Sequence, residues 1–199
     1  MRLNGGMTDL RPMLERAARE FTGLLRAIEP AQLDNRTPCT EYDVRALLNH
    51  LLYWAPWLAA ALRREPAPAA TGGEQDVDLT QGDWLGELCT LVDGIVDTCG
   101  RPGTLVGTTK FGDAEMPAEM IAGMVLTEWV VHGWDLARAT GRPLTVDPEV
   151  AEAVFTSTQA TVEQAREMKV FGPAVPCADE APVLDRLLAL TGRDPGWRA

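Results

Sequence analysis

Apolar residues recur every three or four positions along most of this chain, which is the spacing of one face of an α-helix. The first such stretch runs from Asp9 to Ile28 and stops before Pro30. Further stretches predict helices from about Thr40 to Arg64, Gln81 to Cys99, Pro117 to Gly141, Asp147 to Met168 and Pro182 to Leu190. We therefore expect an all-α protein, a four-helix bundle with an additional C-terminal helix and a short tail.

Local signals refine the limits of these helices. Thr40 and Asp43 fit a capping box at the start of the second helix, and Pro56 should kink that helix. Residues 65–80 are rich in Pro, Ala and Gly, so we expect a long mobile connection there. The Gly- and Thr-rich region before the fourth helix suggests a short extended pair around Thr104–Thr109.

The chain length favours one domain. A chain of 199 residues is most simply a single domain over residues 1–199, with loose termini at 1–8 and 192–199. It contains no apolar run of about 18 residues, the length that predicts a membrane-spanning helix. Its first residues also lack the apolar stretch of a secretory signal. We expect a cytoplasmic protein.

The charge balance limits the possible partners. The net charge is −11, and a field of that sign repels phosphate backbones and anionic lipid. We therefore expect no nucleic-acid and no membrane partner, and a small molecule as the substrate. None of the four cysteines forms a CxxC pair, so reduced thiols are the default in a cytoplasmic chain.

The chain has two histidines, His50 and His132, and each falls in a predicted helix. Glu128 lies four residues before His132, so the two side chains share one helix face. Two imidazoles and one carboxylate can hold a divalent cation and leave a coordination position open, as in catalytic zinc sites. The spacing alone leaves two alternatives open, a hydrogen-bonded core histidine at position 50 and a simple Glu128–His132 ion pair.

Five segments resemble a known family. They are Thr37–Cys39, Val44–His50, Glu128–Gly141, Phe171–Pro176 and Asp185–Pro195. Together they look like the actinobacterial branch of the DinB/YfiT-like metal-binding superfamily, which includes the mycothiol-dependent maleylpyruvate isomerases. The run His-Gly-Trp-Asp-Leu-Ala-Arg-Ala-Thr-Gly is the most specific of these features.

The resemblance implies a DinB-like four-helix bundle with an accessible divalent metal, most often zinc, with nickel or iron as alternatives. The ligands would be His50, Glu128 and His132. It also implies a homodimer as one option for the assembly. The isomerases carry an additional C-terminal domain, whereas only 31 residues follow Met168 here, and Glu41-Tyr42 stands where relatives often have tryptophan.

Three functions follow as hypotheses. The first is a divalent-metal-dependent enzyme that activates mycothiol, a low-molecular-weight thiol, for transfer to, or isomerisation of, a small electrophilic molecule. The second is a metal-dependent hydrolase or a specialised biosynthetic enzyme on the same bundle. The third is a non-catalytic metal- or ligand-binding protein, because fold alone does not decide function.

Two residues after the second histidine are candidates for supporting roles. Asp135 can orient an imidazole by accepting its second N–H, or it can instead form a helix cap or a salt bridge with Arg138 or a neighbouring helix. Arg138 can bind a substrate carboxylate, or it can form an exposed ion pair.

Three further side chains are weaker candidates for the site. Trp54 lies one helical turn after His50 and is a candidate wall of the pocket or a core residue. Lys110 can reach a substrate carboxylate or simply face solvent. Cys39 is a candidate protein thiol near the metal, with a buried structural thiol as the default.

Overall fold

The computed structural model describes residues 9–69 and 72–199, so the N-terminal segment 1–8 lies outside the described residues. Six of its helices are those predicted from the sequence, and the fourth is divided by a π-helical turn, η3. The elements are α1 (Arg11–Leu25), η1 (Pro30–Gln32), α2 (Val44–Arg63), η2 (Glu74–Asp76), α3 (Trp84–Gly100), β1 (Thr108–Phe111), β2 (Ala114–Pro117), α4 (Ala118–Thr127), η3 (Glu128–His132), α5 (Gly133–Thr140), α6 (Pro148–Glu167) and α7 (Val183–Leu190). No helix in these described stretches combines the length and apolar character needed to cross a bilayer.

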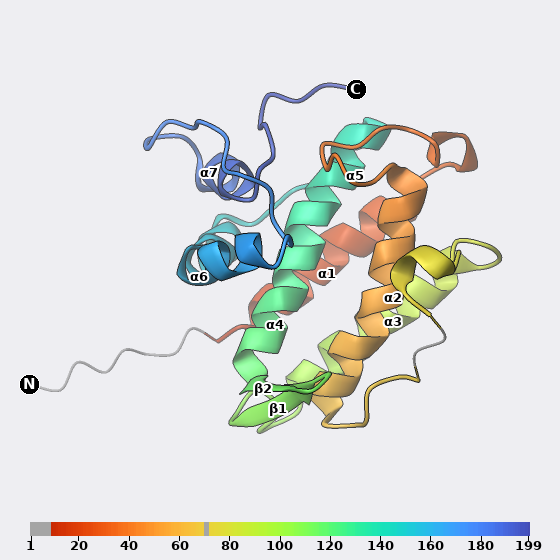
Figure 1. The fold of residues 1–199 in the computed structure, drawn as a ribbon, viewed down its shortest axis with the longest axis vertical. Coiled ribbons are helices and arrows are strands. Elements are labelled where there is room, and N and C mark those ends of the chain that lie inside the picture. Colours follow the sequence, from red (N-terminus) through yellow and green to blue (C-terminus); the bar gives the residue numbers. More distant parts are fainter. Residues whose placement is uncertain (1–8, 70–71) are drawn as a thin grey trace, which may run out of the picture.

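Four helical elements pack as a ring around one core. α1 contacts α3 on one side and the α4–η3–α5 rod on the other, while α2 also contacts both α3 and the rod (Figure 1). Apolar side chains from each element fill the centre, among them Phe21, Leu47, Leu88 and Leu126, all of which are fully buried. Outside this ring, α6 packs on α4 and α1, and α7 packs on α6. The predicted bundle with an additional C-terminal helix therefore agrees with the packing.

The prediction of an all-α protein is corrected by a small antiparallel sheet. Strands β1 and β2 pair from Thr108 with Pro117 to Phe111 with Ala114. The predicted extended pair lay several residues too early, because the tight turn forms at Gly112, whose φ of +60° suits glycine. The Thr109 hydroxyl donates to the Ala61 carbonyl at 2.5 Å, which holds this hairpin against α2.

The start of α2 differs from the predicted capping box. The helix begins at Val44, and the Asp43 carboxylate accepts from the Ala46 N–H at 2.8 Å, so Asp43 itself is the N-cap. Thr40 lies outside the helix because Thr37 holds the preceding turn, donating its hydroxyl to the Tyr42 carbonyl at 2.7 Å.

The connection after α2 is attached to that helix over part of its length. The Asn49 side chain donates to the Glu74 carbonyl at 3.1 Å and accepts from the Leu79 N–H at 2.8 Å. The Tyr53 hydroxyl donates to the Gly72 carbonyl at 2.9 Å. The long connection expected from the sequence is present, and polar side chains on one face of α2 bind the backbone of its residues 72–79.

The C-terminal tail also differs from the loose segment expected at residues 192–199. Arg193 is only 5% exposed, and its guanidinium pairs with Asp135 of α5. Arg138 of α5 donates to the Pro195 carbonyl at 2.9 Å. The tail is therefore joined to α5 at two points, because two arginines satisfy buried or half-buried acceptors there.

Close packing at Gly133 yields a prediction for stability. A Cβ atom added at Gly133 would lie 3.3 Å from both Phe21 Cδ2 and Leu144 Cδ2. We expect Gly133→Ala to lower the free energy of unfolding by about 1 kcal/mol through overpacking. Thermal unfolding of the metal-free protein measures this.

Gly123 in α4 is the matched control, since a Cβ atom there would meet nothing within 4 Å. Gly123→Ala should raise the free energy of unfolding by about 0.5–1 kcal/mol, because alanine is the better helix former. Equal effects of the two substitutions would contradict the packing argument.

Candidate metal centre

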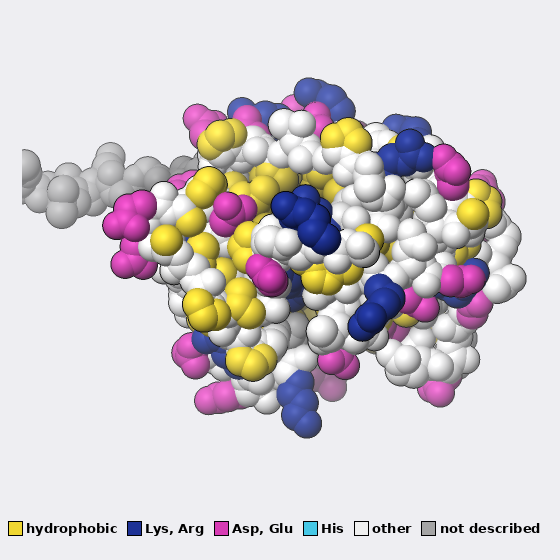
Figure 2. Space-filling view, turned by 90° about the horizontal axis from the view of Figure 1, so that it is seen from above, with side chains coloured by type: hydrophobic (Ala, Val, Ile, Leu, Met, Phe, Trp, Pro, Cys, Tyr) yellow, Lys and Arg dark blue, Asp and Glu magenta, His cyan; other side chains and the backbone are white. Residues whose placement is uncertain are grey.

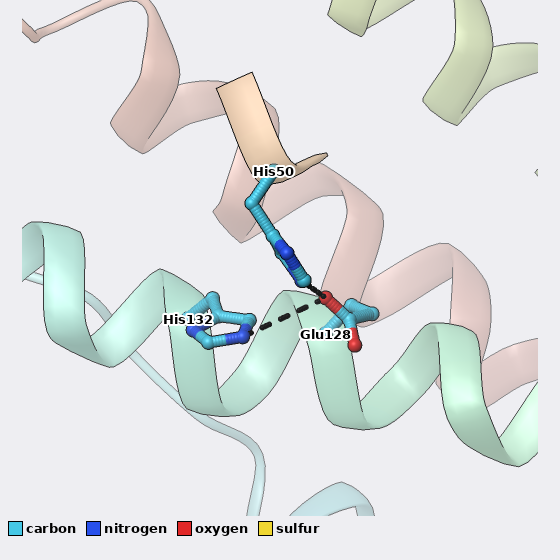
Figure 3. A group of neighbouring side chains, drawn as sticks. All are labelled: His50, Glu128 and His132. Atoms are coloured by element: carbon cyan, nitrogen blue, oxygen red, sulfur yellow. Dashed lines mark ion pairs between the residues drawn. The ribbon is translucent and has the colours of Figure 1, made fainter. Parts of the chain in front are cut away.

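Three side chains from two elements converge inside the bundle. His50 projects from α2, and Glu128 and His132 project toward it from η3 (Figure 3). Glu128 Oε2 lies 3.3 Å from His50 Nε2 and 3.7 Å from His132 Nε2. The three ligand atoms all lie within 4.8 Å of one another. The structure thus brings together the three residues proposed as metal ligands from the sequence.

The π-helical turn divides its residues between the core and the site. Trp129, Val130 and Val131 are buried in the core, and the Trp129 ring lies 6.3 Å from the Phe21 ring in a stacked arrangement. Glu128 and His132, at the two ends of the turn, face α2 instead. Isolated π turns within α-helices occur frequently at functional sites. Packing of the intervening apolar residues therefore holds the two polar residues in place.

The spacing of the donor atoms fits a divalent cation. Two ligands that each lie about 2.1 Å from a zinc ion in tetrahedral geometry are about 3.4 Å apart. The two distances from Glu128 Oε2, 3.3 Å and 3.7 Å, match this value. Glu128 Oε2 is also buried and lacks a hydrogen-bond partner of good geometry. Since buried carboxylate oxygens normally have a partner, this oxygen fits a cation.

The electrostatics of the metal-free site favour charge on His50. Burial lowers the pKa of His50, but the nearby carboxylates of Glu128 and Glu74 outweigh it and raise the pKa to about 9. Burial raises the pKa of Glu128, but His132 and His50 outweigh it and hold that pKa below its usual value. Without metal, therefore, a proton on His50 provides the positive charge that the site requires.

Each imidazole is fixed by a carboxylate on its outer nitrogen. His132 Nδ1 lies 3.0 Å from Asp135 Oδ2, and His50 Nδ1 lies 3.1 Å from Glu74 Oε2. A charged carboxylate only accepts hydrogen bonds, so each Nδ1 carries the proton. Both Nε2 atoms therefore face Glu128 and are able to bind a metal.

The orienting role suggested for Asp135 agrees with its contact to His132, and the alternative ion pair with Arg138 does not form. Asp135 is fully buried and pairs with Arg193 rather than Arg138. Arg138 lies over the Trp134 ring at 5.2 Å and donates to the tail, and the structure does not bring it into the three-residue cluster.

Glu74 is a site residue that the sequence analysis missed. Its Oε2 accepts from Trp54 Nε1 at 2.9 Å as well as contacting His50. The Tyr42 hydroxyl lies 3.1 Å from His50 Nδ1 and completes this group. Glu74 lies in a segment without helical periodicity, so only its acidic character marked it. Its position depends on the hydrogen bonds between Asn49 and the connection.

The remaining candidates occupy different places. Trp54 and Glu128 line one small pocket, so Trp54 forms part of the wall beside the cluster. Lys110 is exposed on β1 and is not part of the cluster. Cys39 is half-buried, and burial raises the pKa of its thiol, although Arg193 opposes this effect. A raised pKa does not favour a reactive thiolate at Cys39.

Proton competition predicts how metal affinity depends on pH. A metal must displace the proton from His50, whose pKa is raised from 6.5 to about 9. We expect the apparent zinc affinity to rise roughly tenfold per pH unit up to about pH 9. Competition titration with a chromophoric chelator measures it.

The metal-free protein should show the opposite trend. The raised pKa contributes stability below pH 6.5, and this contribution is lost as the pH rises through about 9. Urea unfolding of the metal-free protein should therefore show declining stability over that interval. A zinc affinity that does not change with pH over this interval would contradict the assignment of His50 as a metal ligand.

Loss of the Glu74 charge provides a second prediction. Glu74→Gln removes the carboxylate that orients His50, and outer-shell changes of this kind weaken metal binding by about 10- to 100-fold. We expect an affinity loss of about tenfold, measured by the same competition titration. Glu65→Gln is the matched control, because Glu65 belongs to the same connection but pairs with Arg63. Equal affinities for both variants would exclude the role of Glu74.

Comparison with known proteins identifies the family. The model of the mycothiol maleylpyruvate isomerase N-terminal domain matches residues 14–137, more than half of the chain and all three cluster residues. Two Mycobacterium tuberculosis proteins, Uncharacterized protein Rv0738 of strain H37Rv and Uncharacterized protein MT0763 of strain CDC 1551, are each 29% identical to the chain over 195 residues. Each match covers 90% of this chain and 94% of the relative. No solved structure matches the chain. The resemblance seen in the sequence is confirmed, and the chain belongs to the family of the mycothiol maleylpyruvate isomerase N-terminal domain.

Proposed function

We propose that this protein is a divalent-metal-dependent enzyme that activates a low-molecular-weight thiol, mycothiol, for transfer to, or isomerisation of, a small electrophilic molecule. One observation carries the proposal. Two imidazoles whose Nδ1 atoms contact carboxylates face a buried carboxylate oxygen that lacks a hydrogen bond of good geometry, in a chain of a mycothiol-related family. Zinc is the first candidate metal, and the same donor set also accepts nickel or iron. A cytoplasmic location belongs to the same proposal.

Some side chains of the site would bind the metal ion, and others orient those ligands. His50, Glu128 and His132 would hold the ion, and Glu74 and Asp135 keep the two imidazoles in the tautomer that binds metal. Two neutral imidazoles and one carboxylate leave a divalent ion with net positive charge. When bound, such an ion lowers the pKa of a thiol in its open position, so that a thiolate forms at neutral pH.

Shielding of the site suits thiolate chemistry. The side chains of His50 and His132 are 16% and 13% exposed. No histidine side chain is visible when the molecule is seen from the end where α5 and the C-terminus lie (Figure 2). Limited access of water strengthens the electrostatic interactions within the site and slows competing hydrolysis.

Metal content tests the first half of the proposal. The purified protein should hold about one equivalent of a divalent metal by elemental analysis, because three protein ligands make one site. His132→Ala should lose that metal, since only two ligands remain. Glu20→Ala, which removes an exposed carboxylate on α1, should retain it. Absence of metal in the native protein after divalent ions are supplied would overturn the proposal.

Thiol dependence tests the second half. Mycothiol added to the cobalt-substituted protein should change its visible absorption spectrum, and mycothiol conjugation to an electrophile such as chlorodinitrobenzene should require both metal and His132. Hydrolysis of ester or amide substrates without added thiol would instead identify a hydrolase. A protein that binds metal but shows no response to mycothiol and no turnover would be a binding protein.

A further inference from the structure

One carboxylate oxygen contacts both the candidate metal centre and the C-terminal tail. Asp135 Oδ2 lies 3.0 Å from His132 Nδ1 and 3.1 Å from Arg193 Nη2. The side chains of Asp135 and Arg193 are 0% and 6% exposed, so water contributes little to their solvation. Removing one partner of a buried ion pair is costly, because it leaves the other charge without compensation.

Arg193 is also bonded to the end of α7. Its backbone N–H donates to the Leu188 carbonyl, and its side-chain Nη1 donates to the Thr191 carbonyl, each at 2.8 Å. Gly192 has a φ of +85°, and a Cβ atom there would lie 3.1 Å from the Pro173 carbonyl oxygen, so the turn requires glycine. The turn at the end of α7 and the Asp135 carboxylate therefore hold Arg193 together.

The rest of the tail approaches the same helix. After α7 the chain runs toward the end of the bundle where α5 finishes (Figure 1). Arg138 of α5 donates to the Pro195 carbonyl at 2.9 Å. The rod that carries His132 is thus joined to the tail through Asp135 and through Pro195.

We propose that Arg193 is a positioning residue for the metal centre. It fixes the Asp135 carboxylate, which orients His132, so that docking of the C-terminal tail and binding of a metal ion stabilise each other. This inference rests on the metal-binding part of the proposed function. Coupling between two binding events is reciprocal, so the factor by which the tail strengthens metal binding equals the factor by which metal strengthens tail docking.

Zinc affinity and the cobalt spectrum of Arg193 variants test this coupling. Arg193→Met should weaken zinc binding about tenfold and change the visible absorption of the cobalt-substituted protein, since orienting partners typically contribute 10- to 100-fold. Arg193→Lys should recover part of the loss, because it restores the charge without the planar fork. Arg186→Met is the control, because Arg186 lies on α7 but packs over Phe155, and it should match wild type.

A double-mutant comparison keeps the test valid if Arg193→Met does not fold. Asp135→Asn removes the buried charge that Arg193 compensates. In that background, Arg193→Met should cause no further loss of zinc affinity, because its effect passes through the Asp135 carboxylate. A full additional tenfold loss would show that Arg193 acts by another route.

Hydrogen exchange provides the reciprocal measurement on the wild-type protein. Saturating zinc should slow exchange of the Arg193 amide by about the factor that Arg193→Met removes from zinc affinity. Unchanged exchange, or an Arg193→Met variant with wild-type affinity and cobalt spectrum, would overturn the positioning role. Failure of the wild-type protein to bind zinc would instead overturn the proposed function, so the two failures are distinguishable.

Discussion

A charged carboxylate inside an apolar bundle must be compensated, and the rest of this structure is arranged around that requirement. Glu128 places Oε2 in a buried position beside core residues such as Val125 and Trp129. His50 and His132 supply the compensation in the metal-free protein. A divalent cation would replace the proton on His50 while the same three side chains stay close together.

Groups of alternating charge surround Glu128 and extend outward from it. The imidazoles contact Glu74 and Asp135, and Asp135 contacts Arg193. These groups come from α2, the α2–α3 connection, the α4–η3–α5 rod and the tail, which are distant in sequence. One network of polar contacts thus joins four parts of the chain in addition to their apolar packing. This network also explains why segments without regular secondary structure have defined positions.

Parts of this arrangement were predictable from the sequence and parts were not. Helical periodicity predicted six helices, and residue type with spacing predicted the grouping of His50, Glu128 and His132 and the contact from Asp135. Glu74 and Arg193 escaped prediction because their places depend on contacts between distant segments, which no local pattern encodes. The hairpin was placed too early for a similar reason, since Gly- and Thr-rich sequence permits several turn positions.

The π-helical turn makes the length of the rod as important as its composition. A turn with i→i+5 hydrogen bonds accommodates one residue more than the α-helical turn that it replaces. Deletion of Trp129, Val130 or Val131 would convert this turn to regular α-helix and leave α5 close to its present orientation. Glu128 and His132 would then be three positions apart instead of four, and the core would lose one buried apolar side chain. The number of residues in this turn therefore determines which side chains face α2 and which fill the core.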